Sequence, residues 1–125
     1  MHNIQELKVW NESVDLAVNI YQTLKEFPVS EKYGLSDQIK RASVSIGSNI
    51  AEGAGRNTPK EFIHFLGIAS GSASELFTQL EIALRIKILT SETSEKLQNQ
   101  LTYIQKMIYK LHASIRMSIE DNKTN

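Results

Sequence analysis

The chain has 125 residues, which is enough for one domain with a substantial core and too few for two. Its 14 basic and 14 acidic side chains balance, so composition supplies no overall field that would attract nucleic acid or an anionic membrane. Because the sequence contains no cysteine, a disulfide framework and a thiolate metal site are excluded.

No stretch of the sequence has the pattern of a targeting signal or a membrane span. The opening segment, MHNIQELKVW, becomes polar too early for the apolar core of a signal peptide. No apolar run approaches ~20 residues, the length that a membrane-spanning helix needs. The sequence therefore predicts a cytoplasmic protein with no membrane partner.

Apolar residues recur at helical spacing in four segments. The first helix is expected over residues 5–26, and it ends before Pro28 because the residue preceding a proline disfavours helical geometry. The second helix is expected over residues 36–53, where the sequence EGAGRN interrupts it. The stripe expected to face the core on the first helix consists of Leu7, Trp10, Val14, Ala17, Tyr21 and Leu24.

The third helix, expected over residues 59–88, has the clearest start. Thr58 offers a hydroxyl cap, Pro59 stands where no backbone N–H is needed, and Glu61 follows the cap by three positions. This arrangement is the capping box, in which two side chains satisfy free backbone groups reciprocally. It predicts the beginning of the third helix to the residue.

The fourth helix is expected over residues 92–119, after the hydroxyl and acidic residues of TSETSE, and residues 120–125 are expected to fray. The sequence contains no strand-like alternation. Four amphipathic helices with short connections predict an all-α chain, a single domain over residues 1–125, folded as an up-down-up-down antiparallel four-helix bundle.

One side of the second predicted helix is polar, although the opposite side is apolar. These polar residues fit either a catalytic site, with Glu52 as a general base, or a structural network. We prefer the network, and expect the chain not to be an enzyme, because no set of nucleophile, base and orienting group is evident. The expected structural network consists of Arg41, Ser45, Ser48, Asn49, Glu52, Arg56 and Glu75.

Small residues spaced four apart on the second and third helices predict close packing of one helix against another. A glycine inside a helix costs roughly 1 kcal/mol against alanine, so two of them in the third helix require a physical reason. Close approach of a second backbone is the simplest reason. The residues expected to mediate it are Gly47, Ala51, Gly67, Gly71 and Ala73.

No cofactor or metal site is predicted. The Gly-Ala-Gly at residues 53–55 has no preceding strand and no following Gly-Lys-Ser/Thr, so we interpret it as a helix stop and not as a phosphate loop. His2, His64 and His112 are isolated in the sequence, and none belongs to a metal-binding pair of the HExxH or Glu-x-x-His type.

Two features leave a macromolecular partner open. Basic residues near the second helix and its exit are candidates for contact with RNA phosphates, although such charges are ordinarily solvated. They are Lys40, Arg41, Arg56 and Lys60. Apolar residues beyond one bundle seam predict a subunit interface or a wider core. They are Val9, Leu16 and Ile20 on the first helix and Phe65, Ile68, Phe77, Ile82, Leu84 and Ile86 on the third.

Several motifs, taken together, carry a resemblance that covers nearly the whole chain. They are Trp10, Phe27-Pro28, Tyr33-Gly34-Leu35, Gln38-Ile39 with the basic pair Lys40-Arg41, Ser48-Asn49-Ile50-Ala51-Glu52-Gly53, and Gly71-Ser72 with Glu75-Leu76. On these residues the chain resembles the four-helix-bundle proteins encoded by intervening sequences of bacterial 23S ribosomal RNA genes. The resemblance implies an up-down bundle that assembles as a homopentamer.

A related branch of that family, the accessory variability determinant of diversity-generating retroelements, is a basic pentamer that works with a reverse transcriptase and nucleic acid. This chain departs from that branch because its net charge is zero. We therefore expect a non-enzymatic, self-assembling interaction module without a cofactor, with RNA or a ribonucleoprotein as a candidate further partner. An adaptor that offers an apolar groove to another protein is the first alternative, and an enzyme that uses Glu52 as a base is the second.

Overall fold

The computed structural model describes residues 2–31 and 34–124, and these residues form four α-helices and two short 3-10 turns, without a strand. This confirms the all-α prediction. The helices are α1 (Lys8–Leu24), α2 (Leu35–Ala54), α3 (Pro59–Arg85) and α4 (Ser91–Thr124), and the 3-10 turns are Ile4–Glu6 and Val29–Glu31.

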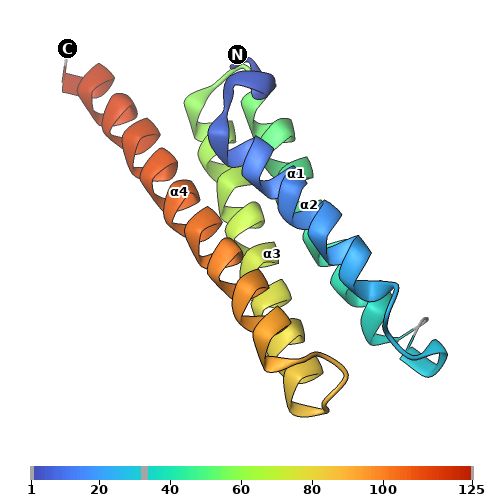
Figure 1. Cartoon of the computed structure of the whole chain (residues 1–125). Coiled ribbons are helices and arrows are strands. Elements are labelled where there is room, and N and C mark those ends of the chain that lie inside the picture. The colour runs from blue at the N-terminus through green and yellow to red at the C-terminus, as the bar shows by residue number, and fades with distance from the viewer. Residues whose placement is uncertain (1, 32–33, 125) are drawn as a thin grey trace.

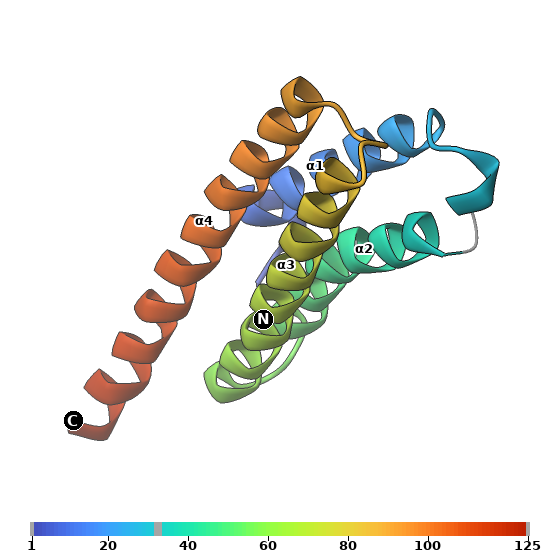
Figure 2. The ribbon, with the colours of Figure 1, turned by 90° about the horizontal axis from the view of Figure 1, so that it is seen from below.

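The four helices are arranged as an antiparallel up-and-down bundle (Figure 1). Each helix packs against the next one along the chain, and α4 returns to contact α1. The contact between α2 and α3 is the most extensive of the four. The C-terminal end of α4 extends away from the other helices, as the views in Figures 1 and 2 both show.

The core is built from aliphatic side chains that recur every three or four residues on each helix. Burial of one such side chain contributes about 1.5–3 kcal/mol, which makes this core the main source of stability. The large side chains with almost no exposed surface are Leu16 and Ile20 on α1, Ile39, Ile46 and Ile50 on α2, Leu66, Leu76 and Leu80 on α3, and Leu101 and Ile104 on α4.

On α1 the core-facing stripe differs from the predicted one. Val9, Leu16 and Ile20, which were assigned to a surplus face, are buried, whereas Val14 and Tyr21 of the predicted stripe are substantially exposed. Both sets fit a helical period, because α1 is apolar over more than one face. The position of α2 and α4 decides which face is covered.

The helix α3 starts where the sequence predicts, and Thr58 caps it as expected, although the Glu61 carboxylate binds the Thr58 hydroxyl and not its backbone. The Thr58 hydroxyl oxygen accepts the backbone N–H of Glu61 at 3.2 Å, and the Thr58 hydroxyl donates to the Glu61 carboxylate at 3.1 Å. Pro59 occupies the first helical position. Residues of the first turn therefore supply the cap that begins this helix.

The end of α3 comes at Arg85, three residues before the predicted end at residue 88. Lys87 adopts a positive φ of 68°, and the backbone N–H of Ile88 reaches back to the carbonyl of Ala83 at 3.1 Å. This is the hydrogen-bond pattern of a Schellman motif, which usually places glycine where Lys87 stands. The absence of glycine explains why the sequence did not reveal the helix end.

The last helix continues through Thr124, beyond the predicted end at residue 119, and residue 125 of the predicted tail lies outside the described residues. No proline or glycine occurs in this segment to stop the helix. The side chains of residues 120–122 are polar and exposed, so they stay hydrated on the extended helix.

Candidate functional site

The polar residues expected on α2 are divided among several separate contacts. Ser45 on α2 and Ser72 on α3 share a hydrogen bond of 2.8 Å between their hydroxyls, in a part-buried position. The Asn49 side-chain amide donates to the backbone carbonyl of Ser45 at 2.8 Å and to its hydroxyl at 3.0 Å. These three residues form a small polar link between α2 and α3.

Glu52 and Arg56 form a second contact one helical turn further along. The Arg56 guanidinium donates to the Glu52 carboxylate at 2.7 Å and lies 4.9 Å from the ring centre of Phe65 on α3. Both members of the ion pair are about half exposed. The pair holds Arg56 against α3 and occupies one oxygen of the carboxylate that a general base would need.

The remaining members of the predicted network lie elsewhere. Arg41 pairs with Asp37 at 2.7 Å on the exposed side of α2. Glu75 accepts a hydrogen bond of 3.3 Å from the Gln79 side chain on its own helix. Ser48 faces α1 and lines the groove described below. The seven residues are thus distributed over separate contacts on α2, on α3 and in the turn between them.

The small residues predicted to allow close packing have different environments. Gly47 faces α1, where an added Cβ would lie 3.6 Å from the Ser13 Cβ, and Ala73 is fully buried. Gly67 and Gly71, in contrast, are exposed, and an added Cβ at either position would meet nothing within 4 Å. The prediction of close packing within the subunit is therefore wrong for Gly67 and Gly71.

The close approach of α2 and α3 occurs instead at Gly53, which the sequence interpretation treated only as part of a helix stop. A Cβ at this position would lie 2.8 Å from the Phe65 Cβ and 2.9 Å from a ring carbon of Phe62. Only glycine fits such a distance without movement of the helices. The sequence signal is the pair of phenylalanines at the start of α3, just after the turn.

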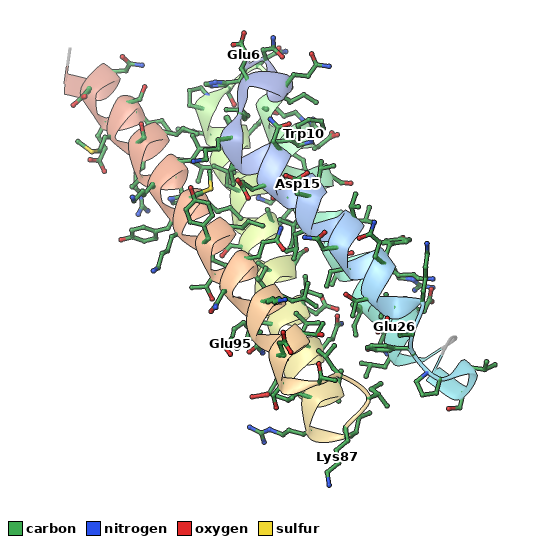
Figure 3. All side chains as sticks on the ribbon, in the orientation of Figure 1. Glu6, Trp10, Asp15, Glu26, Lys87 and Glu95 are labelled. Atoms are coloured by element: carbon green, nitrogen blue, oxygen red, sulfur yellow. The ribbon has the colours of Figure 1, made fainter. Side chains whose placement is uncertain are left out.

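A long apolar groove of about 730 Å³ lies between α1 and α2. It follows α1 from Trp10 to Lys25. Trp10 and Glu26, the residue after Lys25, are labelled in Figure 3. Its lining includes Trp10, Val14, Ala17, Val18 and Tyr21 on α1 and Ser43, Val44, Gly47, Ser48 and Ala51 on α2.

The shape of the groove follows from the sequence of its two helices. Small residues recur every four positions on α2, so one face of this helix carries only short side chains. They are Ser43, Gly47 and Ala51. Larger side chains stand along the groove with two-fifths to one-half of their surface exposed: Val14 39%, Val18 49%, Tyr21 44% and Val44 45%. A contiguous, half-exposed apolar surface of this kind marks a contact site.

A second exposed apolar surface lies on α3, which is separated from α1 by α2. Ile68, Ile82 and Ile86 are 40%, 45% and 50% exposed. Ile68 and Ile82 lie on one side of α3, and Ile86 is the C-cap residue that continues this side. We call these three residues the α3 ridge. The surplus of apolar residues predicted for the third helix is thus partly exposed.

The basic residues considered for RNA binding are held in different ways. The Lys40 ammonium lies 5.4 Å from the ring centre of Tyr21 on α1. Arg41 and Arg56 are paired with carboxylates, and Lys60 is exposed in the first turn of α3. A phosphate must therefore compete with an ion pair at both arginines.

Two other kinds of site can be assessed from the described part of the chain. It contains no group of three or more histidine, aspartate or glutamate side chains placed to hold a metal ion. In residues 2–31 and 34–124, none of the helices is both long and apolar enough to cross a membrane.

Comparison with known proteins places the chain in a family. The model of the 23S rRNA-intervening sequence protein family matches residues 5–110. A solved structure from Bacteroides thetaiotaomicron VPI-5482, described as a protein of unknown function from the S23 ribosomal protein family, is 32% identical in sequence, with a TM-score of 0.79. The similarity covers 84% of this chain and 95% of the other. No curated protein matches the sequence. The chain therefore belongs to the 23S rRNA-intervening sequence protein family.

Proposed function

We propose that this protein is a non-enzymatic module that assembles with further copies of itself, and that the groove between α1 and α2 is one side of the contact between copies. The observation that carries the proposal is the groove itself, whose valine and tyrosine side chains remain about half exposed in the single chain. Covering them with a second apolar surface removes this exposure, at about 25 cal/mol for each Å² buried.

The α3 ridge is the proposed partner of the groove. The groove and the ridge lie on different helices, so a contact between them is heterologous: each copy uses its groove with one neighbour and its ridge with another. Such contacts form a closed ring when a whole number of equal rotations from copy to copy completes a full turn. A ring of five, the assembly that the family resemblance implies, uses both surfaces on every copy.

A mixing experiment with two complementary variants tests this arrangement. Val18→Glu places a charge in the groove, and Ile82→Glu places one on the α3 ridge. Each variant alone should remain a monomer by light scattering. An equimolar mixture should form a dimer, because the intact groove of the Ile82→Glu copy binds the intact ridge of the Val18→Glu copy.

Val29→Glu is the matched control, since Val29 is 84% exposed and lies outside both surfaces. It should leave the native mass unchanged. If Ile82→Glu assembles normally while Val18→Glu does not, the groove pairs with another groove and the ridge assignment is wrong. A wild-type monomer that captures a different protein through the groove supports the adaptor alternative.

RNA association is a second candidate function, favoured by the exposed Lys60 and by the basic pair Lys40-Arg41. It predicts retention of RNA by the purified protein that weakens steeply with salt, because phosphate contacts release counterions. Lys60→Gln should lower the binding, whereas Lys110→Gln on α4 should not. Absence of binding at low salt would rule this function out.

A further inference from the structure

A second cavity, of about 360 Å³, lies where α1 ends and α2 begins. It adjoins the groove, because Tyr21 and Lys25 border both. Its charged lining residues are Lys25 and Lys40, Tyr21 and Ser36 carry hydroxyls, and none of the described residues that line it has a carboxylate. Phe27 and Pro28 belong to the apolar part of its wall. Two cations beside an apolar wall favour a ligand that is anionic at one end.

Ser36 gives the cavity a buried donor. This residue is only 4% exposed, and its hydroxyl has no hydrogen-bond partner among the described residues. A buried hydroxyl without a partner is unfavourable, and a ligand oxygen at the cavity wall would satisfy it. Ser36 therefore indicates a polar ligand independently of the two lysines.

The first turn of α2 adds backbone donors at the same place. Ser36 is the second residue of this 20-residue helix, whose N-cap, Gly34, provides no side-chain hydrogen bond to the free N–H groups. The free N–H groups and the helix dipole favour an anion at this end. Asp37, the acidic residue of the first turn, forms a 2.7 Å ion pair with Arg41 and is not among the residues that line the cavity.

We propose that this cavity binds the phosphate group of a small aromatic phosphate ester. The phosphate accepts hydrogen bonds from Ser36 and the first turn of α2 and pairs with Lys25 and Lys40, while the ring packs against Phe27 and Pro28. A phosphate suits the site better than a single-charge anion because two lysines line one cavity. Ser36 and Lys40 line this cavity and not the groove, so variants at these two positions leave the lining of the groove intact.

The test is a titration of the full chain with phenyl phosphate, followed by the amide signals in two-dimensional NMR spectra. The signals of Ser36 and its neighbours in α2 should move to saturation. Ser36→Ala and Lys40→Gln should each weaken binding about tenfold, the effect expected from losing one charge-assisted hydrogen bond. Lys110→Gln removes an exposed charge on α4 and should have no effect.

Three outcomes would overturn the proposal. Phenol could bind as tightly as phenyl phosphate, which would show a purely apolar cavity. Lys110→Gln could weaken binding as much as Lys40→Gln, which would show diffuse electrostatic attraction. Signals could fail to saturate up to about 10 mM ligand, which would show no site of useful affinity. The native mass of each variant, measured in parallel, separates loss of this site from loss of assembly.

The natural source of the phosphate is distinguished by two further probes. Adenosine monophosphate represents a free nucleotide, and a short RNA with a 5′-phosphate, compared with the same RNA ending in a 5′-hydroxyl, represents an RNA end. Binding of either phosphorylated probe that Ser36→Ala weakens supports the site and names its source. Equal binding of both RNAs, together with no binding of the nucleotide, contradicts it.

Discussion

Substitution of Gly53 by alanine should destabilise the protein, although alanine is the better helix former. The added Cβ would lie 2.8 Å from the Phe65 Cβ, 2.9 Å from a ring carbon of Phe62 and 3.3 Å from the Phe62 carbonyl oxygen. The Phe65 Cβ is fixed to the α3 backbone and the carbonyl belongs to it, so rotation of a side chain cannot relieve the contact. The helices must move apart.

The magnitude follows from two opposing terms. Overpacking of this kind typically costs about 1–3 kcal/mol. The gain in helix propensity from glycine to alanine is at most about 1 kcal/mol, and it is smaller near a helix end such as this one. We therefore expect Gly53→Ala to lower the free energy of unfolding by about 1–2 kcal/mol.

Urea unfolding followed by circular dichroism at one fixed protein concentration measures this change, because assembly makes stability depend on concentration. Gly55→Ala is the matched control: its Cβ would lie 3.5 Å from the Ala51 carbonyl oxygen, an ordinary contact, and its φ of −83° suits any residue. The control should change stability by less than about 0.5 kcal/mol. A Gly53→Ala variant as stable as the wild type would refute the close approach of α2 and α3 at this point.

Three further predictions concern the helix ends and the contact between α1 and α4. Lys87→Gly should stabilise the fold by about 0.5–1 kcal/mol in thermal unfolding, because glycine accepts the positive φ at no steric cost; a loss would contradict the Schellman assignment. Thr58→Ala should cost about 1 kcal/mol in the same measurement, and Thr58→Ser should restore most of it. A hydrogen bond with Tyr103 raises the pKa of Lys8. Protonated Lys8 therefore stabilises the folded state below the unfolded-state pKa of 10.5, and this contribution is lost as the pH rises through the folded-state pKa. The stability difference between Lys8→Met and wild type should therefore be steady below pH 10.5 and shrink as the pH rises above it in urea unfolding, and a difference that stays constant would contradict this.

The sequence predicted those features that depend on local spacing. Hydrophobic periodicity located all four helices, and Thr58 with Glu61 predicted the start of α3. The ion pair between Glu52 and Arg56 likewise joins residues four apart in the chain, at the C-terminal end of α2, which spacing alone can suggest. In each case, residues close together in the chain determine the geometry.

Features that depend on a second helix were not predictable in this way. Val14 and Tyr21 fit a core stripe as well as Leu16 and Ile20 do, and only the placement of α2 leaves the first pair open beside the groove. The glycines show the same limit. The spacing of Gly67 and Gly71 suggested close packing, yet these positions face open space.

Gly53 shows the converse case. Its close contact involves Phe62 and Phe65, whose positions depend on the turn between α2 and α3. The cavity beside Ser36 likewise needs the end of α1 and the start of α2 to meet. A one-dimensional pattern reports which residues share a helix face but not which neighbouring element covers that face.

The most direct test of the central claim is the native mass of the unmodified protein, measured by light scattering over a dilution series after nuclease treatment. Self-assembly into a ring predicts a stable mass near 70 kDa, about five copies of the 14.1 kDa chain. A mass of 14.1 kDa at every concentration would show that the groove and the α3 ridge do not join copies of this chain, and it would contradict the account.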